Sequence, residues 1–557
     1  MTASGLGGAR PAVWTAGAGL VLLVAVPFLF IVLQALFPGL GSGSFATPFA
    51  PLVETLASRD LVGMTVNTVL LGLAVVALAA VLAVPLGVAR ALFRIPFAPV
   101  WDVLFLVPFM IPPYIATLGW IMTLQPNGYL QQLAGFNLSS FLFSLGGMTL
   151  VMALNTFPVV YFSVSRTVEA VGARYSDVAR VFGASPVRAF WRVTLPLATP
   201  GLAASLLLVF AMAIEEYGTP AALGRRAGFE VLVSGIDLRI SDWPIDLPGA
   251  AVISLLLVLL SFLAFLVQRR VLAGRSFETT GGRPSARDKR PLGRLTVPVL
   301  ALFAAVASLA TGVPLFAVLA TAMQKTISGG LVAGNLGLQN FAAILNDSAG
   351  GLRALGTSLS LGVATALIAG LLGALVSYVV VKTGTRGRRT IDVLAMLPNA
   401  LPGIVVAVGL ILAWNQPFLP VTPYNTTLIL LLAYCCILLP HPVRYTNAAL
   451  LQIGDSLEAA ARVCGASGIT ALRRILLPLV APSVTSSMLL VFAVASRELV
   501  ASILVAPVGV QTVATFIWRQ FDQGSIGLGM AMAFIAIVLT TLLPLLVLGA
   551  MRRSPMG

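Results

Sequence analysis

The sequence predicts an all-α, polytopic membrane protein with about twelve transmembrane helices in two homologous six-helix halves. Three observations support this fold class. Of the 557 residues, 58% are hydrophobic and 10% are charged, a composition outside the range of soluble domains. Apolar runs of about 17–25 residues, long enough to cross a bilayer, recur along nearly the whole chain. Finally, two series of Pro and Gly positions repeat at constant offsets.

Each predicted span is defined by a hydropathy maximum. The maxima are centred near Val24, Ala77, Val107, Met152, Leu207, Leu257, Val306, Ala366, Ala407, Leu431, Leu490 and Ile537. The first apolar run, Val13 to Phe37, follows Arg10 as a signal peptide would. It is too long for the core of a signal peptide and has no clear small-residue cleavage site, so we expect a retained helix.

Basic residues are distributed unequally between alternate loops. If the N-terminus is cytoplasmic, 26 of the 34 Lys and Arg residues lie on the cytoplasmic side. The opposite side keeps Arg59, Arg225, Arg226, Arg239, Lys325, Arg353, Arg497 and Arg519. The positive-inside rule therefore predicts that both termini are cytoplasmic. It also accounts for the net charge of +15 without a nucleic-acid partner.

One long polar stretch divides the chain. It is rich in Arg, Gly and Ser and predicts a solvated cytoplasmic linker over residues 269–296, between a first half at 1–268 and a second half at 297–557. The three cysteines, Cys435, Cys436 and Cys464, have no spacing typical of disulfides or metal sites. We therefore expect no metal or other cofactor in this chain.

The two halves share an internal repeat. Pro108, Pro112 and Gly119 recur 290 residues later, and a second series recurs at an offset of 282. The second series pairs Pro158 with Pro440, Gly172 with Gly454, Gly183 with Gly465, Arg192 with Arg474, Pro196 with Pro478 and Pro200 with Pro482. Because each repeat has an even number of spans, the halves should have the same orientation and pack about a pseudo-twofold along the membrane normal. A pathway on that axis would be lined by both halves.

The longest stretch of the repeat lies in two polar loops, 168–196 and 450–478. Asp177 to Phe182 and Glu458 to Cys464 are each expected to form a short helix ended by a glycine in the left-handed conformation. A second short helix should then lead to the Leu-Pro that begins the next span. We call this arrangement an elbow, and its shape suits docking to another protein. The alternative is a basic interfacial segment that contacts lipid headgroups.

These loops resemble the inner-membrane component of binding-protein-dependent ABC importers, whose signature is Glu-Ala-Ala, a glycine and then Leu-Pro. The first half has Asp177-Val178-Ala179 at the Glu-Ala-Ala position, and the second places its acid at Glu458, one residue early. The resemblance implies that the elbows insert into two copies of a cytoplasmic ABC ATPase. It assigns this coupling to Asp177, Ala179, Arg180, Gly183, Glu458, Ala461, Arg462 and Gly465.

The chain itself has no recognisable means of hydrolysing ATP. The phosphate-binding pattern Gly-x-x-x-x-Gly-Lys-Ser/Thr is missing, and so is any catalytic constellation. We therefore expect a permease subunit and not an enzyme, with ATP and Mg used by the ATPase chain. The resemblance also implies a periplasmic or lipid-anchored solute-binding protein, and a location in the bacterial inner membrane among its lipids.

Two other classes of protein fit the sequence less well. A twelve-helix secondary transporter is suggested by the basic loop Lys382 to Arg389, but the acid that should precede such a loop is missing and no embedded acid–base relay is evident. A polytopic membrane enzyme lacks candidate catalytic residues. The importer interpretation is therefore preferred.

Charged residues recur at the outer end of the fifth span of each half. Glu215, Glu216 and Tyr217 in the first half correspond to Arg497, Glu498 and Leu499 in the second. Ionisable groups at membrane depth suggest function, here an outer gate that favours a cation, although they could instead extend to the interface and fix helix depth. The stretches Glu215 to Pro220 and Ser496 to Leu499 resemble the ferric iron branch of the family. Thiamine and polyamine permeases are close to that branch, and phosphonate permeases belong to it as a further alternative. Ferric iron is our preferred solute.

Overall fold

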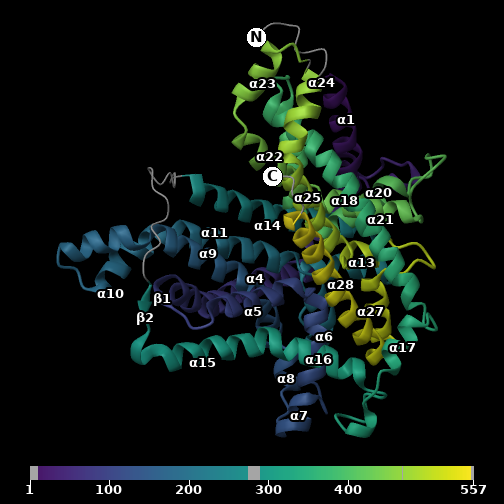
Figure 1. The fold of residues 1–557 in the computed structure, drawn as a ribbon. Helices are drawn as coiled ribbons and strands as arrows, with labels where there is room; N and C mark the ends of the chain where they lie inside the picture. The colour runs from purple at the N-terminus through teal and green to yellow at the C-terminus, as the bar shows by residue number, and fades with distance from the viewer. Residues whose placement is uncertain (1–9, 274–288, 467, 554–557) are drawn as a thin grey trace. The chain divides into compact units, whose positions relative to one another are not determined.

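The computed structural model describes residues 10–273, 289–466 and 468–553 and shows an almost entirely helical chain (Figure 1). Among these residues the only strands are β1 (Phe93–Arg94) and β2 (Arg290–Pro291), which pair in parallel. The predicted all-α class is confirmed. Residues 274–288, the larger part of the predicted linker, lie outside the described residues.

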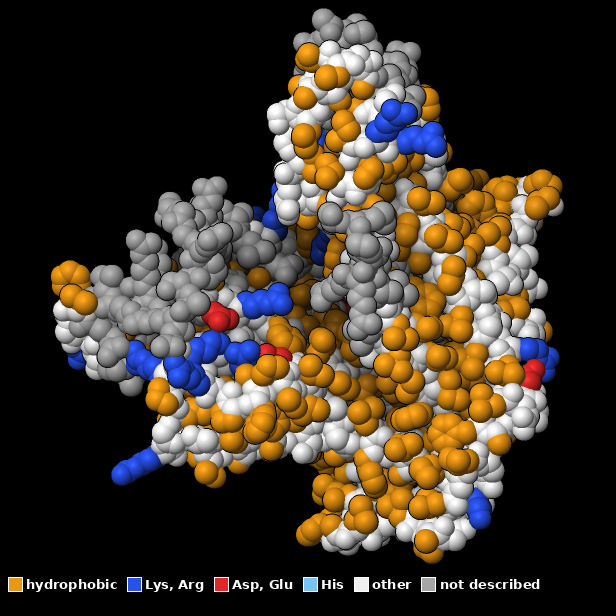
Figure 2. All heavy atoms as spheres, viewed as in Figure 1, with side chains coloured by type: hydrophobic (Ala, Val, Ile, Leu, Met, Phe, Trp, Pro, Cys, Tyr) orange, Lys and Arg blue, Asp and Glu red, His pale blue; other side chains and the backbone are white. Residues whose placement is uncertain are grey.

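Nine helical segments in the described part of the chain are long and apolar enough to cross a membrane, and three bent pairs raise that number to twelve. The nine are Pro11–Leu36, Arg59–Leu92, Leu145–Ala170, Phe190–Glu215, Leu247–Val271, Gly293–Met323, Gly351–Lys382, Arg473–Ala495 and Ile526–Pro544. Every predicted centre falls within one of these spans or bent pairs. Hydrophobic side chains cover much of the visible surface (Figure 2), as expected where lipid is the solvent.

Proline breaks the bent pairs. The chain bends by 97° between α5 (Ala98–Met110) and the following segment Pro113–Ala134, and by 114° between Arg388–Ala400 and Gly403–Trp414. Pro112 and Pro402, which belong to the repeat, lie at these two sharp bends. Proline has no N–H and its ring clashes with the preceding turn, so a helix cannot continue straight through it. The repeated prolines therefore predict where both bends occur.

A buried amide compensates for the first bend. Asn155 of α9 (Leu145–Val181) donates from Nδ2 to the carbonyl oxygens of Pro108, at 2.8 Å, and Ile111, at 3.3 Å. Pro112 has no N–H to offer the Pro108 carbonyl, and Ile111 lies at the bend itself. Within a membrane such carbonyls need a partner from the protein, which explains a polar side chain in the middle of an apolar span.

The chain forms two compact units that do not coincide with the sequence halves. One comprises Met1–Ala57, Ile236–Val258 and Leu338–Gly557, and the other comprises Ser58–Gly235 and Leu259–Gly337. We call them unit 1 and unit 2. Unit 1 contains the first span of the chain, α1 (Arg10–Leu20) and α2 (Val26–Leu36), together with most of the second half. Unit 2 contains most of the first half together with α15 (Thr296–Ala307) and α16 (Val313–Met323). Each unit thus takes its first span from the other half.

Two repeated glycines lie where these exchanged spans pack. A Cβ added at Gly409 of α20 (Gly403–Trp414) would lie 2.8 Å from the carbonyl oxygen of Pro27 in α2. A Cβ added at Gly119 of α6 (Pro113–Leu124) would lie 3.3 Å from the Cα of Pro314 in α16. Small residues allow helices to approach closely in membranes. The glycine at this repeat position is therefore explained by the same contact in both units.

Three helices pack together in each unit. In unit 2 they are α4 (Arg59–Leu92), α9 and α11 (Leu195–Glu215), and in unit 1 they are α18 (Gly351–Lys382), α22 (Pro440–Gln452) and α25 (Leu477–Ala495). The remaining helices are α3 (Ala50–Ala57), α7 (Tyr129–Ala134), α8 (Ser139–Leu142), α10 (Pro186–Ala189), α12 (Arg225–Ala227), α13 (Leu232–Ser241), α14 (Leu247–Ala273), α17 (Gln339–Leu345), α19 (Arg388–Met396), α21 (Thr427–Leu438), α23 (Asp455–Val463), α24 (Gly468–Ala471), α26 (Val500–Val505), α27 (Val513–Asp522) and α28 (Ile526–Arg553). Both elbows follow directly from the second helix of these trios.

Candidate functional site

The first elbow begins where α9 ends. Gly183 takes a φ of +84°, and the N–H of Ala184 donates to the carbonyl oxygen of Ala179 at 3.0 Å. This is the glycine cap that satisfies the last carbonyls of a helix. α10 and a π-helical turn, Phe190–Thr194, then lead into α11.

The second elbow has the same geometry. Gly465 takes a φ of +81°, and the N–H of Ala466 donates to the carbonyl oxygen of Ala461 at 2.9 Å. α24 and a π-helical turn, Leu472–Leu476, lead into α25. The prediction that both glycines adopt the left-handed conformation is confirmed.

The two elbows differ in the helix that precedes the glycine. A separate short helix over Asp177 to Phe182 was predicted wrongly, because α9 continues without a break to Val181. In the second half α22 ends at Gln452 and the separate α23 begins at Asp455. Asp455 and Ser456 favour a helix start over a helix interior, whereas the first half has Ala173 and Arg174 at the equivalent stretch.

Each elbow exposes an apolar side chain one or two residues before its glycine. Val181 and Phe182 are 84% and 85% exposed, and Val463 is 88% exposed. Ala461 is buried and Ala179 is half-buried. The exposed apolar side chains stand at the same position of both repeats, since Val181 and Val463 are 282 residues apart. The side chains of Asp177, Arg180, Glu458 and Arg462 lie outside the described part of the structure.

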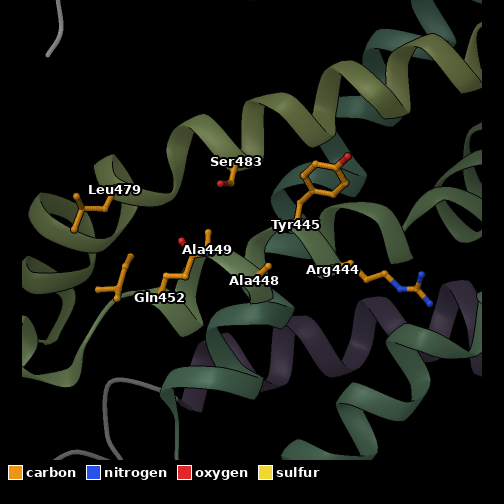
Figure 3. A pocket seen from close by; sticks show the side chains of 8 residues that line it. Arg444, Tyr445, Ala448, Ala449, Gln452, Leu479 and Ser483 are labelled. Atoms are coloured by element: carbon orange, nitrogen blue, oxygen red, sulfur yellow. The ribbon is translucent and has the colours of Figure 1, made fainter. Parts of the chain in front are cut away.

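A groove lies between α22 and α25, the helices that precede and follow the second elbow (Figure 3). Its lining comes from α22, the residue after it, and α25, and consists of Arg444, Tyr445, Ala448, Ala449, Gln452, Ile453, Leu479 and Ser483. In the first half the equivalent helices are in close contact, because Ser163 Oγ donates to the Gly201 carbonyl at 3.2 Å and an added Cβ at Gly201 would lie 2.6 Å from Thr167 Oγ1. In place of Ser163, Thr167 and Gly201 the second half has Tyr445, Ala449 and Ser483, all three of which line the groove.

The predicted gate carboxylates Glu216 and Glu498 have matching environments. Both oxygens of Glu216 accept the backbone N–H of Thr219, at 3.1 and 2.9 Å. Both oxygens of Glu498 accept the N–H of Ala501, at 3.2 and 3.1 Å, and Oε2 also accepts that of Ser502 at 3.2 Å. Each side chain therefore caps the helical turn that follows the fifth span of its half.

The other three predicted gate residues differ from this pattern. Glu215 is partly exposed and lies beside Ser261 of α14, while Tyr217 is buried. Arg497, the repeat counterpart of Glu215, is partly exposed. Glu215, Glu216 and Tyr217 belong to unit 2, and Arg497 and Glu498 belong to unit 1.

Sequence reasoning missed a hydroxyl pair behind Glu216. Thr117 Oγ1 of α6 lies 2.8 Å from Thr219 Oγ1, and both residues are fully buried. This contact connects the bent α5–α6 span to the turn that Glu216 caps. Threonine is common in apolar helices, so only the three-dimensional contact identifies these two. Within the described residues no group of three or more His, Cys, Asp or Glu side chains could hold a metal ion.

Comparison with known proteins assigns the fold to a family. The family model described as "Binding-protein-dependent transport system inner membrane component" matches residues 59–275 and again residues 362–553. One match covers most of each sequence half, the first running seven residues into the predicted linker, and both begin after the first span of that half.

Several curated relatives are similar over most of their length. The ferric transport system permease protein FbpB of Actinobacillus pleuropneumoniae is 25% identical over 93% of this chain and 76% of its own. A putative ferric transport system permease protein of Haemophilus influenzae is 26% identical over 85% of this chain and 75% of its own. A putative 2-aminoethylphosphonate transport system permease protein of Salmonella paratyphi A is 27% identical over 41% of this chain and 85% of its own. Because one family model matches twice and covers more than half of the sequence, this chain belongs to the inner-membrane components of binding-protein-dependent transport systems.

Proposed function

We propose that this chain forms the solute pathway of an ATP-driven importer of ferric iron. The observation that supports the class best is the doubled elbow, with a left-handed glycine and an exposed apolar tip at the same position of each repeat. Two relatives that align with most of this chain are named as ferric transport permeases. The same importer for a phosphonate is the second candidate, because a relative of that name aligns with 41% of this chain.

ATP hydrolysis would take place in a separate ATPase, with one copy bound to each elbow. Val181 and Phe182 would enter a groove on one copy, and Val463 would enter the equivalent groove on the other. Closure of the ATPase dimer would pull on both elbows and rock the two halves between inward-open and outward-open states. The glycine caps keep each tip at a fixed angle to the helix before it, so the pull reaches the spans.

Within the outer gate, Glu215 is a better candidate than Glu216 or Glu498 to bind a cation. The carboxylates of Glu216 and Glu498 are already committed to backbone N–H groups, and a carboxylate so engaged offers less to a passing solute. Glu215 has no such backbone partner among the described contacts. A solute-binding protein on the external side would deliver the solute to this end of the pathway.

The chain carries its own probe for ATPase docking. Cys464 is exposed at the tip of the second elbow, whereas Cys435 and Cys436 are buried. The permease would be purified from its native membrane with whatever ATPase accompanies it, and maleimide labelling of the complex would be compared with labelling of the permease alone. We expect several-fold slower labelling of Cys464 in the complex, and no labelling in the Cys464→Ser control. Equal rates in both samples would contradict docking at this elbow.

Transport then distinguishes the solute and the energy source. Proteoliposomes that contain the complex should accumulate ferric iron only with ATP inside the compartment that the elbows face, and 2-aminoethylphosphonate, thiamine and a polyamine serve as competitors. Uptake that is lost when a proton gradient is dissipated, and that does not depend on ATP, would favour the secondary-transporter alternative. Uptake of only one competitor would transfer the proposal to that solute.

A further inference from the structure

The end of the predicted linker binds back to unit 2. Lys289, the first described residue after 274–288, donates from Nζ to the carbonyl oxygen of Arg90 at 2.9 Å and lies 3.2 Å from Glu169 Oε1. The next two residues form β2, which pairs with β1 directly after α4. Basic side chains gather over this part of the molecule (Figures 1 and 2). The linker end is thus attached both to the end of α4 and to α9.

A partly buried ionic cluster lies at the same end of unit 2. Arg90 binds the Asp102 carboxylate through Nε and one terminal nitrogen, with a shortest distance of 2.8 Å. Tyr161 of α9 donates its hydroxyl to Asp102 Oδ1 at 2.7 Å. A two-pronged arginine–carboxylate contact with a third donor is among the most directional polar contacts in proteins. It ties together α4, α5 and α9.

These contacts hold α9 at two places. Tyr161 and Glu169 are eight residues apart, about 12 Å along a helix at 1.5 Å per residue. From Glu169 the helix continues for a further twelve residues, about 18 Å, to its end at Val181, next to the first elbow. Any change in the direction of α9 at Glu169 is therefore carried to the tip of that elbow.

The second half lacks equivalents of Tyr161 and Glu169. Val443 and Leu451 occupy the positions of Tyr161 and Glu169 at the offset of 282. Neither can make the polar contact of its counterpart. There Lys382 of α18 donates instead to the carbonyl oxygen of Ile453, at 2.9 Å, beside the open groove between α22 and α25. The two elbows are thus supported differently.

We propose that Lys289, Glu169 and the Arg90–Asp102–Tyr161 cluster are positioning residues for energy coupling. Lys289 makes the linker end a latch that fixes the direction of α9, and through it the first elbow. This inference rests on the proposed function of the elbows. It gives the linker a role beyond joining the halves, and it makes the first elbow the stiffer of the two.

The latch is tested first without any ATPase. A spin label at Phe182→Cys in a Cys464→Ser background reports the first elbow, and a label on native Cys464 reports the second. In the full chain, Lys289→Glu and Glu169→Lys should each increase label mobility at 182 and leave mobility at 464 unchanged. The double variant should restore the mobility at 182, because the charges again attract. Arg294→Met, which removes an exposed basic residue of the same segment, is the matched control and should change neither label.

Coupling is then measured on the permease with its copurifying ATPase, as solute transported per ATP hydrolysed. We expect a several-fold lower ratio for Lys289→Glu, a ratio near wild type for the double exchange, and no change for Arg294→Met. The proposal is overturned if both labels respond equally, if neither responds, or if mobility at 182 rises while the ratio stays at wild type. If no ATPase is recovered at all, the proposed function fails, and the mobility experiment still decides whether the latch exists.

Discussion

Glu216 and Thr219 are joined through the backbone, because both carboxylate oxygens of Glu216 accept the Thr219 N–H within 3.1 Å. The repeat places Glu498 and Ala501 in the same relationship. A negative charge at a helix start is stabilised by the unpaired N–H groups and by the helix dipole. Capping of a helical turn in both halves is a structural reason for the carboxylate to be repeated. Experiments can separate this structural role from solute binding.

Removal of the cap should destabilise the protein, whereas its neutralisation should not. Glu216→Ala and Glu498→Ala lose every acceptor for the N–H groups, and loss of a cap costs about 0.5–2 kcal/mol. Glu216→Gln and Glu498→Gln keep one acceptor oxygen and should unfold at nearly the wild-type temperature. Thermal unfolding of the purified permease in one detergent measures both effects.

Transport by the glutamine variants then assigns the role. If capping is the whole function of these carboxylates, both glutamine variants transport at close to the wild-type rate. Glu215→Gln is the comparison, because its carboxylate has no such backbone partner and should lose transport of a cation while remaining folded. A transport defect in Glu216→Gln as large as that in Glu215→Gln would contradict the assignment.

The left-handed glycines of the elbows should tolerate asparagine better than alanine or aspartate. A non-glycine residue in this conformation costs about 1–2 kcal/mol, and asparagine is the residue that accepts it most readily after glycine. We expect Gly183→Asp and Gly465→Asp to insert into the membrane and to lose ATP-driven transport. The matched Gly183→Asn and Gly465→Asn variants should retain most of it. Wild-type transport in both aspartate variants would refute the coupling role.

The exchanged spans predict an order of stability for two equivalent substitutions. A Cβ at Gly409 would lie 2.8 Å from a backbone oxygen, whereas at Gly119 its nearest neighbours are 3.3 Å away. Gly409→Ala should therefore lower the unfolding temperature clearly and Gly119→Ala only slightly, because overpacking of a tight contact costs about 1–3 kcal/mol. Gly356→Ala, where an added Cβ meets nothing within 4 Å, is the control. The reverse order would mean that the packing of α2 on α20 differs from that described.

The features that the sequence predicts well are those set by local chemistry. Hydropathy locates the nine candidate spans and the three bent pairs of the described residues, because a span must be long and apolar enough to cross the bilayer. Pro112 and Pro402 mark the bends, and Gly183 and Gly465 mark the caps, because proline and glycine act on the backbone where they stand.

The features that escape prediction depend on partners distant in sequence. The exchange of first spans depends on how Gly409 and Pro27 approach, and no local pattern encodes that approach. Lys289 is one of several basic residues in a polar segment, and only its contact with Glu169 distinguishes it. The capping by Glu216 has a local signature, because the carboxylate and the N–H that it accepts are three residues apart. The rule for ionisable groups in membranes nevertheless predicts a gate from the same residue.

The composition of the compact units predicts that the two halves assemble without a covalent linker. Fragments 1–280 and 281–557, expressed together, should copurify through a tag on either one, because each unit needs a span from both fragments. Residues 281–557 supply α15 and α16 to unit 2, and residues 1–280 supply α1 and α2 to unit 1. The control is the pair 58–280 with 338–557, which lacks both exchanged first spans and keeps only Ile236–Val258 as a contribution of the first fragment to unit 1. That pair keeps most of each unit but lacks both exchanged spans, and we expect far lower recovery of one fragment with the other. Equal recovery of the two pairs would show that other contacts hold the halves together.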